Sequence, residues 1–301
     1  MPIGLITPMD AANTIVEDVT DLITNVDFES TPFYSSLAES QATNTLHSWL
    51  VDGYDSPADN AQIEGNDITF TDLTVPTRSP NIVQLFQKDV RVSNTEQRVA
   101  HYGMADPYTY QLKKKMVEMA RDFEKALVAG TTASGSSGVA RQLNGAIALI
   151  TTNKTARASG TSLSETEFND ILQGIYDSGT DISVDKAFTG ASLKRVISGY
   201  TAGSTKFTRS EGDKLYNTFS VYESDFGVVT VYLEREVPTT AGNKGILLVD
   251  SSKWRVAYLT DGRPQHIPLA TIGSAKRGML EAELTLEALN EGSSAYRSGY
   301  L

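Results

Sequence analysis

The stretch RVSNTEQRVAHYGMADPYTYQLKKKMVEMARDFEKALVAG, residues 91–130, decides the fold that the sequence predicts. It ends a strand, turns, and then carries one long amphipathic helix. Asp106 is placed to cap this helix, and Pro107 occupies the first turn, where the missing N–H of proline leaves no hydrogen bond unmade. Gly130 is expected to end the helix as the left-handed glycine that often follows one. The residues between them would form a rod about 35 Å long.

One face of this helix is apolar. At about 100° per residue, its apolar residues span an arc of about 100°, which is the width of one buried face. The side chains predicted to form this face are Leu112, Met116, Met119, Ala120, Phe123 and Leu127. Lys114, Glu118, Arg121 and Lys125 lie on the opposite side and are expected to be solvated. The helix is therefore predicted to be the backbone of a domain and not a catalytic cradle.

Two strand candidates precede the helix, at residues 45–51 and 81–92. The connection at 52–80 carries five prolines and glycines and is long for a compact domain. It still contains β-prone pieces at 68–70 and 73–75, which favours a long two-stranded excursion that projects from the body. An isolated hairpin is only marginally stable in water, so this excursion would need a partner surface.

Residues 275–289 have the composition of a helix but the periodicity of a strand. Leu280, Ala282, Leu284, Leu286 and Ala288 alternate strictly with Glu281, Glu283, Thr285 and Glu287. Because periodicity outranks propensity, we predict a long strand that pairs with residues 81–92, with the leucines buried and the glutamates facing out.

The other elements are shorter. We expect an arm at 1–44 with one helix near 15–23, a flexible joint at 130–138 and a mostly polar segment at 153–160. Ser164 and Glu167 form a capping box for a helix at 165–178. A second helix is expected at 192–198, and strands are expected at 187–189, 228–233, 246–249 and 253–259.

The composition excludes several classes of protein. The 301 residues suffice for one elaborated domain or two, and the 40% hydrophobic content is ordinary for a globular protein. A net charge of -11 with a pI near 4.8 disfavours general electrostatic binding to nucleic acid or anionic membrane. The absence of cysteine excludes disulfides and thiolate zinc sites. Because the sequence shows no signal peptide and no membrane span, we expect a soluble protein made in the cytosol.

The residues that usually carry chemistry are scattered. None of the three histidines has a partner at the spacing of metal ligands. The glycine- and serine-rich residues 130–138 lack the Gly-Lys-Ser/Thr ending of a phosphate-binding loop, and they follow a helix instead of opening one. The three lysines at 113–115 are too short a run for a nucleic-acid patch. We therefore predict no catalytic residue, no cofactor and no metal site.

Short motifs spread over residues 15–155 carry a resemblance to a known family. In order they are Thr31-Pro32-Phe33, Ser36-Leu37, Trp49, Asp52, Glu64-Gly65, Thr77-Arg78-Ser79-Pro80-Asn81, Val92-Ser93-Asn94-Thr95, Met119-Ala120-Arg121-Asp122-Phe123-Glu124 and Ala140-Arg141-Gln142-Leu143-Asn144-Gly145. Together with the order of the elements, they resemble the major capsid proteins of tailed bacteriophages, which have the Hong Kong 97-type fold. The later lobe matches by layout only.

The resemblance implies an α+β fold in five parts. These are an N-terminal arm (1–44), an extended loop or E-loop (45–92), a peripheral domain with a spine helix (93–138), an axial domain (139–260), and a return strand of the peripheral domain with the C-terminus (261–301). The side chains that would contact other subunits are Phe33, Trp49, Tyr54, Phe70 and Arg78. The core of the spine helix would be Leu112, Met116, Met119, Phe123 and Leu127.

The function implied by the resemblance is structural and not enzymatic. Hexamers and pentamers of the chain would self-assemble in the host bacterial cytoplasm into an icosahedral shell, the virion capsid. The partners implied are separate scaffolding and portal proteins, with a decoration protein as a further partner. The shell would enclose double-stranded DNA without sequence-specific binding, and no membrane is involved.

Two alternatives stay open. An encapsulin-like nanocompartment protein has the same fold and encloses cargo enzymes, so the contents of isolated shells would separate it from a capsid protein. An acid–base hydrolase that uses the scattered carboxylates would instead elute as a monomer with one titratable activity. The resemblance begins near residue 15, so we expect no built-in scaffolding segment, and neither partner of the Lys–Asn crosslink formed by some relatives can be matched here.

Overall fold

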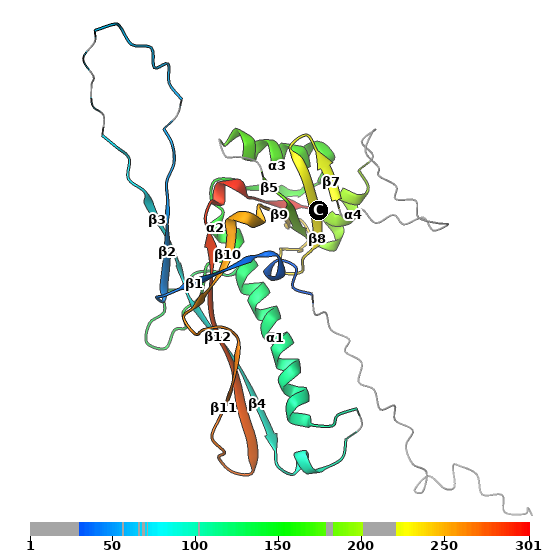
Figure 1. Ribbon diagram of the computed structural model, residues 1–301. Coiled ribbons are helices and arrows are strands. Elements are labelled where there is room, and N and C mark those ends of the chain that lie inside the picture. The colour runs from blue at the N-terminus through cyan, green and yellow to red at the C-terminus, as the bar shows by residue number, and fades with distance from the viewer. Residues whose placement is uncertain are drawn as a thin grey trace, which may run out of the picture.

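The computed structural model describes residues 30–55, 57–65, 67, 70, 72–101, 103–178, 183–200 and 221–301. The helix expected near 15–23 lies outside these residues. Within them the chain forms two larger sheets, a two-stranded ribbon, four α-helices and short 3-10 turns. Figure 1 shows the long helix α1 beside one sheet, the second sheet at the far end of α1, and a loop that extends away from both.

The first sheet is built on strand β12 (Ala275–Ala288). Three strands pair with it antiparallel, and β1 extends the sheet by pairing parallel with β10. Their bounds are β1 (Ala38–Ala42), β4 (Gln84–Ser93), β10 (Trp254–Leu259) and β11 (Gln265–Pro268). The register runs from Ala275 opposite Ser93 to Leu284 opposite Gln84. The prediction of a long strand here, paired with the strand before the helix, is confirmed.

The burial of the side chains on the two faces of β12 matches the expectation except at the C-terminal end of the strand. Leu280, Ala282, Leu284 and Leu286 are buried as predicted, and Glu281 and Glu283 are half-buried. The expectation that Glu287 faces solvent is wrong, because Ser40 Oγ donates a hydrogen bond of 2.7 Å to Glu287 Oε2 and covers it.

Helix α1 (Pro107–Ala129) packs across β4 and β12. The Asp106 side chain accepts a hydrogen bond from Tyr108 N at 3.1 Å, so the predicted cap is confirmed. Met119, Phe123 and Leu127 are buried, and the ring of Phe123 meets that of Phe86 edge-on at 4.9 Å.

Two side chains predicted for the core of α1 lie differently. Leu112 is only partly buried, and Met116, with 52% of its surface exposed, does not face the core as expected. Met116 belongs to neither of the two apolar clusters on which the helix packs, although Leu112 before it and Met119 after it both contact the larger one.

Gly130 does not end the helix in the left-handed conformation, since its φ is -58°. A glycine is needed here because the backbone of residue 130 lies close to that of Ala126, and a Cβ would lie 2.3 Å from the Ala126 carbonyl oxygen. In the segment expected to be a joint, Ala133 and Gln142 exchange backbone hydrogen bonds of 3.1 and 3.0 Å.

The second sheet has six strands in the order β5-β13-β9-β6-β8-β7. Their bounds are β5 (Lys154–Thr161), β6 (Lys186–Thr189), β7 (Val221–Ser224), β8 (Gly227–Leu233), β9 (Lys244–Val249) and β13 (Ala295–Tyr300). Helices α3 (Glu165–Asp177) and α4 (Ala191–Ser198) share a core with this sheet, and α2 (Ala146–Leu149) packs near the end of α1. Residues 139–260 and 261–301 each contribute strands to both sheets, so strand pairing does not follow these two ranges.

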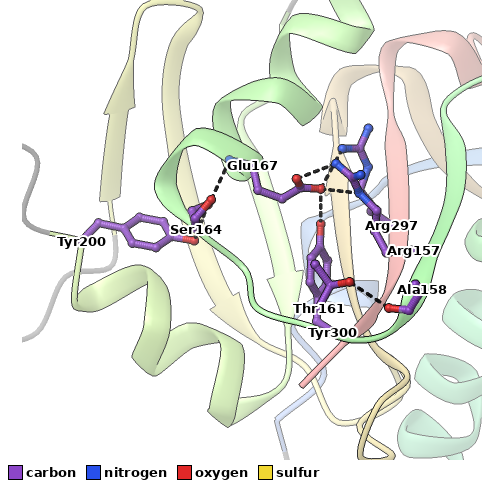
Figure 2. A network of polar contacts seen from close by, with 8 residues as sticks. All are labelled: Arg157, Ala158, Thr161, Ser164, Glu167, Tyr200, Arg297 and Tyr300. Atoms are coloured by element: carbon purple, nitrogen blue, oxygen red, sulfur yellow. Dashed lines mark hydrogen bonds and ion pairs between the residues drawn. The ribbon is translucent and has the colours of Figure 1, made fainter.

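Glu167 ties α3 to the second sheet (Figure 2). Ser164 Oγ accepts a hydrogen bond from Glu167 N at 3.1 Å, but the Glu167 side chain does not complete the predicted capping box. Its carboxylate accepts instead from Arg157 Nε at 2.7 Å and from Arg297 Nη1 at 3.1 Å. Burial opposes ionisation, yet these two guanidinium groups hold the pKa of Glu167 below its ordinary value.

The contrast between Phe123 and Met116 gives a test of the core. Phe123→Ala should lower the free energy of unfolding by about 3–5 kcal/mol, because it leaves a cavity under the sheet. Met116→Ala should cost less than about 1 kcal/mol, because half of that side chain is already exposed. Denaturant titrations of both variants measure the two values, and similar losses would contradict this description of the helix face.

Candidate assembly surface

A two-stranded ribbon carries the most exposed part of the described chain. Strands β2 (Leu46–Val51) and β3 (Thr77–Ile82) pair antiparallel, from Leu46 opposite Ile82 to Val51 opposite Thr77. Beyond them lies the segment 52–76, here called the excursion loop, and Figure 1 shows its described residues extending away from both sheets. The expected strand at 73–75 is not formed, and residues 68 and 69 of the other expected piece lie outside the described residues. Among the residues that the structure describes, the two-stranded part of the excursion is confined to its base.

The excursion loop exposes large apolar side chains. Phe70 and Leu73 each have 92% of their surface exposed, and Tyr54, Ile63 and Val75 are also largely exposed. On the ribbon below, Leu46 and Leu50 add a further exposed pair. Exposed apolar groups at this density on a projecting segment are typical of a surface that another protein covers.

The same loop is strongly acidic. Between residues 52 and 76 the acidic side chains are Asp52, Asp55, Asp59, Glu64, Asp67 and Asp72, and no lysine or arginine occurs. The loop therefore combines six negative charges with exposed aromatic and aliphatic groups. A partner for this surface needs an apolar contact flanked by positive charge.

The five side chains predicted to contact other subunits fall into two groups. Tyr54, Phe70 and Arg78 are exposed on the excursion loop and the ribbon, and their contact with another subunit stays a prediction. Phe33 and Trp49 require a correction, because both are buried within this chain.

Phe33 is fully buried and packs edge-on against Phe188 at 5.3 Å. Trp49 belongs to the same core cluster, where the ring of His47 lies 5.9 Å from it. Sequence alone could not separate these aromatics from those of the excursion loop, since their burial depends on residues distant in the chain.

Asn81 fixes the base of the ribbon. Its Nδ2 donates to Leu286 O at 2.7 Å and to Asn144 O at 3.0 Å. Its Oδ1 accepts from Asn144 N and Ile82 N, each at 2.8 Å. One buried amide thus joins β3, β12 and the segment after α1. The sequence signal for this role is a polar residue that directly follows Pro80 within a run of strand residues.

Two further contacts strengthen this junction. Gln84 Oε1 accepts from Leu143 N at 3.1 Å, and Arg141 pairs with Glu283 at 3.2 Å. The base of the ribbon is therefore held by several polar contacts, whereas the described tip is held by few.

The N-terminal half of α1 exposes positive charge, whereas the excursion loop is acidic. Lys113 and Lys114 are exposed, and the half-exposed Met116 lies one turn further on. Met116 lies three residues after Lys113 and therefore on the same side of the helix, whereas Lys114 lies on the opposite side.

The described residues give no sign of a metal centre or a membrane span. Among them, no group of three or more His, Cys, Asp or Glu side chains is arranged to hold a metal ion. None of the helices within the described ranges is long and apolar enough to cross a membrane.

Two sequence comparisons with known proteins both match major capsid proteins. The family model described as SU10 major capsid protein matches residues 6–299. The major capsid protein of Escherichia phage Phieco32 is 35% identical over 103 residues, which is 34% of this chain and 29% of that protein. The match therefore spans less than a third of that relative.

Solved structures show the same fold at low identity. A chain from the capsid of a native GTA particle has a TM-score of 0.69 at 11% identity, covering 99% of this chain and 100% of that one. The Cyanophage A-1(L) capsid gives 0.67 at 12%, covering 98% and 99%. The SrpI encapsulin of Synechococcus elongatus PCC 7942 gives 0.57 at 11%, covering 99% and 96%. The predicted α+β fold of Hong Kong 97 type is confirmed.

The role of Asn81 can be tested by truncation. Asn81→Ala removes four hydrogen bonds and leaves two carbonyl oxygens and two N–H groups without this partner, so the free energy of unfolding should fall by about 2–4 kcal/mol. The matched control is Asn60→Ala in the exposed excursion loop, which should change it by less than about 0.5 kcal/mol. Denaturant titration of both variants measures this difference, and equal values would exclude Asn81 as an anchor.

Proposed function

Because the chain belongs to the SU10 major capsid protein family, we propose that it is the repeating subunit of an icosahedral phage shell that encloses double-stranded DNA. The observation that carries this proposal is the excursion loop, a projecting segment with exposed apolar side chains on an anchored base. Such a segment gains little from its own subunit, so covering it on a neighbour would stabilise an assembly.

A second copy of the chain offers a complementary surface. The excursion loop carries acidic and apolar groups, and the first half of α1 exposes Lys113, Lys114 and Met116. We infer that the loop of one subunit lies on α1 of the next. This contact would cover Met116 and pair the loop carboxylates with Lys113, which lies on the same side of α1, and it supports repeated head-to-tail association.

This proposal changes the boundaries of the domains that the resemblance implied. The excursion loop and ribbon would be the E-loop, and α1 with the five-stranded sheet would be the peripheral domain. The six-stranded sheet with α3 and α4 would be the axial domain. In this division β10 belongs to the peripheral domain and β13 to the axial domain, unlike the ranges expected from the sequence.

The further partners are proposed from family membership. The shell would be built from hexamers and pentamers in the cytoplasm of a bacterial host, together with separate scaffolding, portal and decoration proteins. The net charge of -11 suits an inner wall to which DNA does not adhere, so packaging would need no sequence-specific contact. In this role the chain performs no catalysis.

A nanocompartment shell protein is the second candidate, favoured by the structural likeness to the SrpI encapsulin. The match of residues 6–299 to a phage capsid family favours the capsid over it. Electron microscopy of the protein from its native particles, followed by nuclease digestion before and after disruption, separates the two. Shells that protect double-stranded DNA support the capsid, and shells that hold only protein cargo support the nanocompartment. A monomer with hydrolytic activity would contradict both.

The excursion loop gives a test of the assembly contact. The double variant Phe70→Ser with Leu73→Ser should raise the concentration required for shell formation at least about tenfold, because each lost apolar side chain costs about 1.5–3 kcal/mol per contact. The control with Phe70→Leu and Leu73→Met keeps the apolar surface and should assemble. Light scattering measures assembly, and unchanged unfolding of the subunit shows that only association is affected.

A charge exchange tests the partner surface. Lys113→Glu with Lys114→Glu should prevent assembly, and adding Asp67→Lys with Asp72→Lys should restore it, because the pairing is then reversed in sign. Arg195→Glu, an exposed change on α4, serves as the control for charge alone. If Asp67→Lys with Asp72→Lys does not restore assembly, the loop contacts another surface.

A further inference from the structure

Strand β4 forms an open edge of the five-stranded sheet. It pairs with β12 on one side, and among the described residues no strand pairs with its other side. Figure 1 shows β4 along one side of β12 and β11 along the other. The 10 residues of β4 keep an unbroken register with β12 and include no proline or glycine. The edge is therefore regular, about 33 Å long and able to accept a further strand.

Alternate residues of β4 direct their backbone groups towards this open edge. In an antiparallel ladder, facing residues alternate between pairs that exchange two hydrogen bonds and pairs that exchange none. Arg277 O accepts from Leu269 N at 3.1 Å, on the side of β12 away from β4, so Arg277 and the facing Arg91 form a pair of the second kind. By the same alternation, Gln87, Asp89 and Arg91 direct their N–H and C=O groups to the open edge. Within the described ranges, no other element forms a hydrogen bond to these groups.

The side chains along this edge carry opposite charges in close succession. Asp89 and Arg91 are exposed on the face of the sheet away from α1, because Val90 between them packs on the α1 side. Arg91 faces Arg277 directly, and like charges in facing positions destabilise a sheet. Among the described residues, neither arginine lies within ion-pair distance of a carboxylate, and Arg277 Nε is buried without an acceptor. An acidic group beside Arg91 would therefore relieve a repulsion within the subunit.

A second copy of β4 supplies that acidic group in one register. Two identical edges can pair antiparallel about a two-fold axis that passes through one residue position of each strand. With the axis at Val90, Asp89 of each copy faces Arg91 of the other, and Gln87 faces Ser93. An axis at Asp89 or at Arg91 would instead set like charges opposite each other. An axis at position 88 would face each aspartate with a glutamine and each arginine with a leucine, so only the axis at Val90 pairs the charges.

We propose that β4 is an interaction surface for a second copy of this chain, with the two β4 edges paired antiparallel about a two-fold axis at Val90. The pairing makes the five-stranded sheets of two subunits continuous. Backbone hydrogen bonds run along the joined edges, and two Asp89–Arg91 ion pairs cross them. The α1 helices of both copies lie on the same face, because the axis is perpendicular to the sheet.

This contact goes beyond the loop contact proposed above and has a different symmetry. A loop that lies on α1 of the next subunit makes a head-to-tail contact, and such contacts close rings such as hexamers and pentamers. A shell built from rings also needs contacts between rings, and a two-fold contact at β4 joins subunits of different rings. In that role the inference rests on the proposed function, whereas the pairing itself can be tested on the isolated chain.

The first experiment inverts the edge charges in the full-length chain. The background is Phe70→Ser with Leu73→Ser, which removes the loop contact and should sediment as a dimer. Asp89→Arg and Arg91→Asp should each raise the dissociation constant of this dimer at least about tenfold, since like charges then face each other. An equal mixture of the two variants should restore the dimer, and so should both changes in one chain.

The control for charge alone is Glu223→Arg, an exposed change on β7 at the edge of the other sheet, which should keep the dimer. Denaturant unfolding of each variant should match that of the background, which shows that only association is affected. A background chain that sediments as a monomer, or a dimer that persists in both single variants, would overturn the pairing.

The second experiment fixes the register with cysteines, since the native chain has none. Facing residues in an antiparallel pair lie about 5.5 Å apart at Cα, within the range that a disulfide spans. A mixture of Asp89→Cys and Arg91→Cys chains should therefore crosslink under oxidising conditions, and it keeps one of the two ion pairs. Neither variant should crosslink to that extent alone.

The crosslinks also separate this inference from the proposed function. Equal crosslinking by Asp89→Cys alone would overturn the register centred on Val90. Shells that assemble from the mixture without the crosslink would overturn the edge contact and leave the loop contact standing. Crosslinked dimers of the mixture, together with a native chain that forms no shells, would support the edge contact and contradict the proposed function.

Discussion

The pairing of β12 with both β4 and β10 is the interaction on which the rest of the structure depends. Its 14 residues pair with β4 over the first part and with β10 over the second, so one strand joins segments about 170 residues apart. Helix α1 can cover this sheet only because Leu280, Ala282 and Leu284 present one apolar face. A slip of one residue would turn these side chains to the opposite face, and the packing of α1 would be lost.

The same strand separates a fixed part of the molecule from an exposed part. Leu286 O accepts from the Asn81 amide, and Glu283 pairs with Arg141, so β12 holds the base of the ribbon from two positions. The excursion loop starts directly beyond this anchored base. The position of its apolar groups is therefore partly fixed before a partner binds, which lowers the entropic cost of ordering them in the contact.

Much of the fold could be predicted from local pattern. Period-two alternation identified β12, and a capping aspartate before a proline identified the start of α1. The exposure of Met116 could not be predicted, because its angle on the helix places it on the apolar face, and whether that face is covered there depends on residues distant in the chain. Phe33 and Glu124 are 91 residues apart and contact each other in the buried part of the molecule, so no local sequence pattern could predict the burial of either. Strands β1 and β13 were missed for a similar reason, since their pairing partners supply most of their order.

The charge of the excursion loop gives the proposed contact its selectivity. Six acidic side chains fall within 25 residues of a chain whose net charge is -11, so more than half of that net charge is concentrated on this segment. Two such loops repel each other even though both expose Phe70 and Leu73, which disfavours contact between loop tips. In the proposed contact Lys113 of α1 would attract the loop instead, with Met116 as the apolar counterpart. Apolar area then provides the strength of the contact, and charge decides which surface the loop meets.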